Sequence, residues 1–189
     1  MIRLKRSVKN HDSVEIDDEY GTPKVFGKKG NEITFHELCK KIGMQPKLDV
    51  CGSRENHVVD NYITEKMDSL KRDWSMDWFM NPPYSKVRQF MEYAWKQHRK
   101  WNTNGLILVY AKTDTDWWHN WVESKVYDTI YNPNAPRLSN GMNEVTRHFI
   151  DKRLHFIKDG QPTKNSAPYP SVWICYWKDN STTTFQTNS

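Results

Sequence analysis

The chain has 189 residues, the length of one domain with a buried core, and carries 28 Lys and Arg against 23 Asp and Glu, for a net charge of +5. No apolar run approaches the roughly 20 residues that cross a bilayer, and no apolar signal segment follows Met1, so we expect neither a membrane span nor secretion. Aromatic residues make up 13%, which predicts a core built on rings.

The cysteines and histidines give no sign of a metal site. Cys39, Cys51 and Cys175 lack the C-x-x-C spacing of zinc sites, and three cysteines make no disulfide framework. The seven histidines are scattered, without paired spacing. We therefore expect no metal ion, and a reducing compartment such as the cytoplasm.

The sequence predicts one folded domain over residues 20–178. Residues 1–19 mix charges without periodicity and predict a flexible arm, and the polar stretch 179–189 predicts a disordered tail. No repeat or linker divides the domain, and the sequence gives no indication of the oligomeric state.

Two elements are predicted early in that domain. Thr34 with Glu37 three residues later is a capping-box pattern, and apolar side chains then recur at helical spacing up to Gly43, a stop signal. Residues 48–53 form a short apolar run into small residues, which indicates a strand end, and residues 61–64 predict a second short strand.

The clearest pattern lies in the middle of the chain. Residues 77–80 are an apolar strand that runs into Asn81-Pro82-Pro83-Tyr84, where proline ends it. Ser85 is a suitable N-cap for the following helix, whose apolar side chains recur at 3-1-3-1 spacing. Residues 106–111 are continuously apolar, as in a strand covered on both faces.

The remaining pattern completes the fold class. Residues 113–124 predict a Trp-rich helix, and residues 126–132, 147–157 and 171–177 predict strands. Helices that alternate with apolar strands predict an α/β fold.

The Asn-Pro-Pro-Tyr segment is the strongest candidate for chemistry, because ligands of α/β sheets bind at the carboxyl ends of strands. The exocyclic amine of adenine is a poor nucleophile, since its lone pair is delocalised into the ring. The carbonyls of the Asn81 side chain and of the rigid Pro82 backbone can grip both N–H bonds and favour a reactive geometry. Tyr84 offers a face for an extruded base, at about 1–3 kcal/mol per stacked base. The alternative is an ordinary turn in which Asn81 precedes a strand-ending Pro82-Pro83 pair and Tyr84 packs in the core.

Three other residues, Trp117, Trp118 and Asp114, can each be interpreted in two ways. The tryptophans at 117, 118 and 121 are most simply explained by core packing, which we assign to Trp121. Trp117 or Trp118 could instead stack on a base or fill the space that it leaves. Asp114 is either a helix N-cap or a support of the site near Tyr84.

The segment at 81–84, following a strand, resembles motif IV of S-adenosylmethionine-dependent amino-methyltransferases. Further blocks resemble, in matching order, those of the phage-type DNA N6-adenine methyltransferases, the phage Dam family. They are Tyr20-Gly21-Thr22-Pro23 (W/Y-x-T-P), residues 48–56 (D-x-C/A-A-S-x-E-N), Tyr62 to Trp74 (Y-x-T … D-x-L … D-W), residues 112–118 (R-T-D-T-x-W), and Arg153 to Phe156 with Ala167 to Ser171 (R-L-x-F … A-P-x-P-S). The likeness covers residues 20–177.

The resemblance implies a Rossmann-like fold, with a mixed sheet flanked by helices, and S-adenosylmethionine as the methyl donor. Carried over by position, the family's cofactor contacts fall on Asp49, Cys51 and Ser53 beside the methionine part, on Thr22 and Pro23 closing over it, and on Asp68 or Asp73 at the ribose or adenine. One departure is that the F-x-G-x-G loop of many methyltransferases is absent, and only Cys51-Gly52-Ser53 stands at that turn.

The resemblance also implies transfer to the N6 amine of an adenine extruded from double-stranded DNA. The family's target-base contacts fall on Asn81, Pro82, Pro83 and Tyr84. We expect further substrate contacts from Ser85, Asp114, Trp117 and Trp118, with target recognition in the Trp-rich segment and in residues 131–150. A viral source, and hence a host cytoplasm, follows from the resemblance alone.

Other functions remain open. The same motif occurs in enzymes that methylate cytosine N4, RNA or a protein glutamine, and an inactive relative would bind DNA without using a cofactor. A nuclease or deaminase is disfavoured, because the chain lacks clustered metal ligands and an H-x-E plus C-x-x-C pattern.

Overall fold

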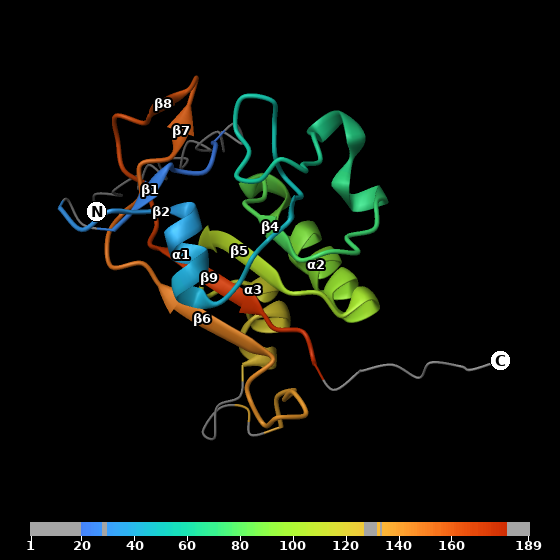
Figure 1. Cartoon of the computed structure of the whole chain (residues 1–189). Helices are drawn as coiled ribbons and strands as arrows, with labels where there is room; N and C mark the ends of the chain where they lie inside the picture. Colours follow the sequence, from blue (N-terminus) through green and yellow to red (C-terminus); the bar gives the residue numbers. More distant parts are fainter. Residues whose placement is uncertain (1–19, 28–29, 127–131, 133, 181–189) are drawn as a thin grey trace, which may run out of the picture.

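The computed structural model of the chain describes residues 20–27, 30–126, 132 and 134–180 (Figure 1). The predicted arm at 1–19 and nearly all of the predicted tail and of the strand at 126–132 lie outside the described residues. None of the helices in the described ranges is long and apolar enough to cross a membrane.

The centre of the molecule is a five-stranded mixed sheet, which confirms the predicted α/β class with a mixed sheet. Its strands stand in the order β3-β4-β5-β9-β6. The first three are parallel, and β9 is antiparallel to both of its neighbours. Their bounds are Leu48–Asp49 (β3), Trp78–Met80 (β4), Gly105–Tyr110 (β5), Ser171–Tyr176 (β9) and Val145–Phe149 (β6).

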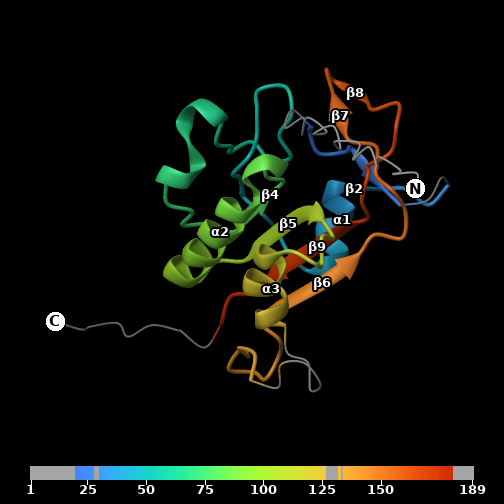
Figure 2. The ribbon, with the colours of Figure 1, turned by 180° about the vertical axis from the view of Figure 1, so that it is seen from behind.

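Helices cover both faces of this sheet. Helix α1 (Phe35–Ile42) lies on one face, and α2 (Val87–Trp101) and α3 (Asp116–Trp121) lie on the other, as Figures 1 and 2 show from opposite sides. Each face has its own apolar core, because alternate residues of a strand point to opposite faces. Every residue of β5 and β9 is buried, which for β5 confirms the covered strand that the apolar run at 106–111 predicts.

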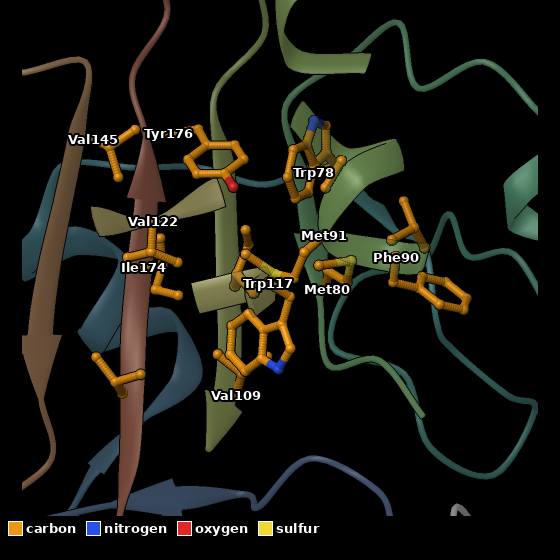
Figure 3. Packing of buried hydrophobic residues seen from close by; sticks show 14 of the residues in the cluster. Trp78, Met80, Phe90, Met91, Val109, Trp117, Val122, Val145, Ile174 and Tyr176 are labelled. Atoms are coloured by element: carbon orange, nitrogen blue, oxygen red, sulfur yellow. The ribbon is translucent and has the colours of Figure 1, made fainter. Parts of the chain in front are cut away.

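The core is rich in rings, as the composition predicts. Trp78, Trp117 and Tyr176 pack with methionine and aliphatic side chains between the sheet and its two-helix face (Figure 3). The indole of Trp78 lies so close to β5 that a Cβ at position 105 would stand 2.3 Å from it, which explains Gly105. Aromatic side chains thus replace much of the aliphatic volume that the chain lacks.

The local signals around α1 are confirmed. The Thr34 hydroxyl accepts from the Glu37 N–H at 3.2 Å, and the Glu37 carboxylate accepts from the Thr34 N–H at 2.8 Å. Gly43 ends the helix with a φ of 86°, a left-handed conformation that favours glycine.

Short elements complete the fold. Two hairpins are formed by β1 (Val25–Phe26) with β2 (Ile33–Thr34), and by β7 (Ile157–Lys158) with β8 (Gln161–Pro162). Single 3-10 turns stand at Glu65–Met67, Ser69–Lys71, Tyr84–Lys86 and Glu123–Lys125.

Two local predictions are wrong, and one of the two interpretations of Asp114 is excluded. Ser85 is not the N-cap of α2, because the carbonyl of Pro83 accepts from the Lys86 N–H at 3.0 Å and forms a 3-10 turn first, so that Lys86 takes the cap position. Asp114 is not the N-cap of α3, since that position falls on Thr115. Residues 61–64 form no strand; only Tyr62 makes a single bridge to Asp49.

Candidate active site

The candidate site lies where the parallel strands β3, β4 and β5 end. Asp49 ends β3, Asn81 follows β4 and Tyr110 ends β5, so the three residues come to one edge of the sheet. Two segments remote in sequence meet over this edge (Figure 1), because Gly21 and Ile157 exchange backbone hydrogen bonds of 2.7 and 3.0 Å. We call this the carboxyl edge.

Asn81 has an immobilised side chain with one unpaired acceptor. The residue is 9% exposed, and its amide nitrogen donates to the Thr22 hydroxyl at 3.2 Å and to the Tyr20 carbonyl at 3.4 Å. Its Oδ1 atom is buried and has no hydrogen-bond partner among the described residues. Buried polar atoms are nearly always paired, so an orphaned acceptor at this position points to a ligand donor.

Tyr84 forms a stacked pair with Tyr110. Their ring centroids are 3.8 Å apart with 2° between the planes, and Phe156 meets Tyr84 edge-on at 6.1 Å. Burial, and then the neighbouring Tyr110 hydroxyl, raises the pKa of Tyr84 well above its usual range, so its ring stays neutral. One face of the Tyr84 ring is therefore occupied by the protein itself.

A cavity of about 800 Å³ borders this stacked pair, and we call it the aromatic cavity. Trp117 lines it from α3, whereas Trp118 does not and packs in the core at 2% exposure. Asp114 and Ser85 are exposed and lie outside its lining. Its rings are those of Tyr20, Tyr84, Tyr110, Trp117, Phe156 and Tyr169.

A second cavity, of about 760 Å³, lies beside α1, and we call it the α1 cavity. Thr22 and Pro23 line it, whereas Tyr20 lines the aromatic cavity. The segment 20–23 therefore borders both cavities, and Asn81 is bonded to this segment. Apolar walls come from Phe35 and Val58, among others.

The loop after β3 is shaped by Asp49. The side chain is 2% exposed, and its two oxygens accept from the N–H groups of Cys51 and Val58, each at 3.1 Å. Burial raises the pKa of Asp49 to about 6, although these hydrogen bonds oppose the shift. Gly52 fits inside the loop because a Cβ there would lie 2.7 Å from Tyr62.

Asn56 joins this loop to the segment that closes over it. The Ser53 hydroxyl accepts from the Asn56 N–H at 3.0 Å, and the Asn56 side chain accepts from the Thr22 N–H at 3.0 Å. The sequence does not predict this role, although Asn56 belongs to the block at 48–56. The loop, Thr22 and Asn81 thus form one connected network.

Comparison with known proteins identifies the family. The family model of DNA N-6-adenine-methyltransferase (Dam) matches residues 15–186. The chain belongs to this family. A DNA N-6-adenine-methyltransferase of Haemophilus phage HP1 (strain HP1c1) is 30% identical over 144 residues, which cover 75% of this chain and 80% of that protein. No solved structure matches the chain.

As a member of the Dam family, the protein is an adenine-specific DNA methyltransferase, with DNA as its substrate and a methyl donor as its second reactant. Within the described residues, no group of three His, Cys, Asp or Glu side chains could hold a metal ion.

The two acidic candidates of this Dam-family protein are separated. Asp68 follows a 3-10 turn and precedes Ser69, whose hydroxyl donates to the Val50 carbonyl, so it stands near the end of β3. A hydrogen bond from Lys71 at 2.8 Å lowers the pKa of Asp68. Asp73 forms an ion pair of 2.6 Å with Lys100, which lies in the last turn of α2. This end of α2 stands at the edge of the sheet opposite to the carboxyl edge. The structure thus places only Asp68 near the other site residues.

Proposed function

We propose that this Dam-family protein transfers a methyl group from S-adenosylmethionine to N6 of an adenine extruded from double-stranded DNA, on a Rossmann-like fold. The observation that carries the proposal is the buried Oδ1 atom of Asn81, which has no hydrogen-bond partner in the part of the chain that the structure describes. The parallel β4-α2-β5 unit and the helices on both faces of the sheet support the fold assignment.

Asn81 would act on the target amine through its fixed carbonyl. Thr22 and Tyr20 hold the amide nitrogen, so the oxygen is already oriented before any substrate binds. An acceptor preorganised in a buried site stabilises developing charge without reorganising during the reaction. Together with the Pro82 carbonyl, it would draw the amine of adenine toward a nucleophilic geometry.

Tyr84 would hold the extruded adenine by stacking. Adenine N6 inside a stacked pair is out of reach, so the base must leave the duplex. Tyr110 covers one face of Tyr84, so the base would stack on the other face. The aromatic cavity has the volume and the apolar walls of a small-molecule site.

The residues beside Thr22 fit S-adenosylmethionine. The α1 cavity, about 760 Å³, lies within the range of ligand sites, and its polar groups near Thr22, Pro23 and Asn56 stand among apolar walls. Cys51 and Ser53 lie in the Asp49 loop, which Asn56 joins to Thr22, and they are not among the residues that line this cavity. When bound, the cofactor supplies a methyl group made electrophilic by a positively charged sulfur. Asp68, rather than Asp73, is our candidate for the ribose hydroxyls.

The proposal is tested by the identity of the product. The protein is incubated with isotopically labelled S-adenosylmethionine and with plasmid DNA, RNA or denatured protein in parallel, and each product is hydrolysed and separated. We expect label in N6-methyldeoxyadenosine. Label in N4-methylcytosine, in RNA or in glutamine would replace the proposed substrate, and an unlabelled product together with DNA binding would indicate an inactive relative. The phage relative suggests a host cytoplasm as the place of action.

A further inference from the structure

Three lysines stand around the aromatic cavity. Lys112, Lys158 and Lys164 line it together with one carboxylate, that of Asp159. The Lys112 ammonium lies 4.5 Å from the ring centroid of Tyr169. Within the described part of the chain, neither Lys112 nor Lys164 forms an ion pair. The rim of the cavity is therefore positively charged, which suits a ligand with an anionic group next to an aromatic ring.

Two of these lysines belong to a segment that is exposed and yet firmly anchored. We call residues 157–169, from β7 to Tyr169, the overhanging segment. It is tied down by the Thr163 N–H donating to Phe156 at 2.8 Å and by the Ala167 N–H donating to Leu154 at 2.7 Å, besides the Gly21–Ile157 bridge. A loop held in place before binding loses little entropy when it meets a partner.

The tip of the overhanging segment is polar. Gln161, Lys164, Asn165 and Ser166 are all exposed. Amide and hydroxyl groups of this kind contact phosphates and base edges in DNA. Figure 1 shows the β7-β8 hairpin projecting from the main sheet.

Residues 134–145, within the region in which the sequence predicted target recognition, lie elsewhere. Val145 pairs with Tyr176, which itself pairs with Gly105 at the start of β5. Glu144 bonds to His98 at 3.1 Å, near the end of α2. The described residues 134–145 therefore stand at the edge opposite Asn81, whereas β6 carries the rest of that region back toward the end of β5, where the Ile150 N–H donates to the Ser171 carbonyl at 3.0 Å.

We propose that the overhanging segment is the DNA-recognition element, in which Lys158 and Lys164 bind phosphates beside the extruded nucleotide. This rests on the proposed function and adds the surface that holds the target strand. The anionic backbone and the aromatic base of one nucleotide match the positive rim and the ring-lined interior of the same cavity. Lys112 closes the rim from the end of β5.

The test is the salt dependence of DNA binding. Lys158→Ala, Lys164→Ala and the double variant are compared with Lys41→Ala, which removes the same charge from the last turn of α1 at the opposite edge. The probe is a fluorescein-labelled duplex of mixed sequence, and its fluorescence anisotropy is measured as protein is added at each of a series of salt concentrations. We expect each rim variant to weaken binding several-fold and to reduce the log–log salt slope by about one, with the double variant losing about two.

Two further measurements keep the outcome clear. Lys164→Arg should retain wild-type affinity because it keeps the charge, and thermal unfolding shows whether each variant is folded. Wild-type affinity and slope in a folded double variant, or an equal loss in Lys41→Ala, would overturn the proposal. Failure of the wild-type protein to label adenine would instead overturn the proposed function, and the two failures are read in separate assays.

Discussion

The replacement Asn81→Ala tests the role of the orphaned acceptor. It removes Oδ1 and the two hydrogen bonds that the amide nitrogen donates to Thr22 and Tyr20. Loss of one preorganised hydrogen-bonding group typically lowers kcat by about 10²–10³, or about 2.7–4 kcal/mol in the barrier. The variant should still fold, since two lost hydrogen bonds cost about 1 kcal/mol each, part of which is offset because the unpaired Oδ1 atom is removed as well.

The assay is single-turnover transfer of labelled methyl groups to DNA, with thermal unfolding in parallel. Thr22→Val is the matched variant, because it removes the partner of the Asn81 amide and leaves Oδ1 in place. We expect a smaller fall in rate for Thr22→Val than for Asn81→Ala. A folded Asn81→Ala protein with a transfer rate within about threefold of the wild-type rate would refute the assigned role, since a threefold change in rate is less than about 1 kcal/mol in the activation free energy.

Three more outcomes follow from the geometry. Tyr110→Leu removes the ring that stacks on Tyr84, and an aromatic pair of this kind contributes about 0.5–1.5 kcal/mol. We therefore expect 2-aminopurine at the target position of the DNA to stack less well on Tyr84, so that its fluorescence is quenched less than in the wild-type complex. Gly21→Ala would place a Cβ 2.3 Å from the Asn56 amide, so we expect about 1–3 kcal/mol lower stability by urea unfolding and slower methyl transfer; an unchanged midpoint would argue against the close contact. Burial would raise the pKa of Glu144, but its hydrogen bonds to the side chains of His98 and Arg99 in α2 hold it below the usual 4.5. This stabilisation is present at neutral pH and is lost as the pH falls through the lowered pKa, so the melting temperature of Glu144→Gln should fall less in acid than that of the wild type.

The elements with local signals are the ones that the sequence predicts. The capping box of α1 involves residues three apart, and the strand before Asn81 ends at prolines, so both are fixed by neighbouring residues. The spacing of apolar residues predicts α2 for the same reason. The start of α2 is missed by one residue, because the 3-10 turn at Tyr84–Lys86 depends on how Pro83 turns the chain.

The contacts that complete the site are not local. Asn81 is hydrogen-bonded to Thr22, 59 residues away in sequence. Tyr84, in the 3-10 turn after β4, stacks on Tyr110 at the end of β5. Pairing of this kind depends on strand order, which periodicity does not encode. For the same reason, the sequence does not predict that Asp68 and Asp73, which are close in sequence, stand at opposite edges of the sheet.

The central claim is that the Asn81 carbonyl receives the amine of an extruded adenine. The most direct measurement is a crystal structure of the protein with duplex DNA and a non-reactive analogue of the methyl donor. We expect the target adenine outside the duplex, its N6 within about 3 Å of Asn81 Oδ1 and its ring parallel to Tyr84. A target base whose amine is bound by other groups, with Asn81 Oδ1 still unpaired, would contradict it.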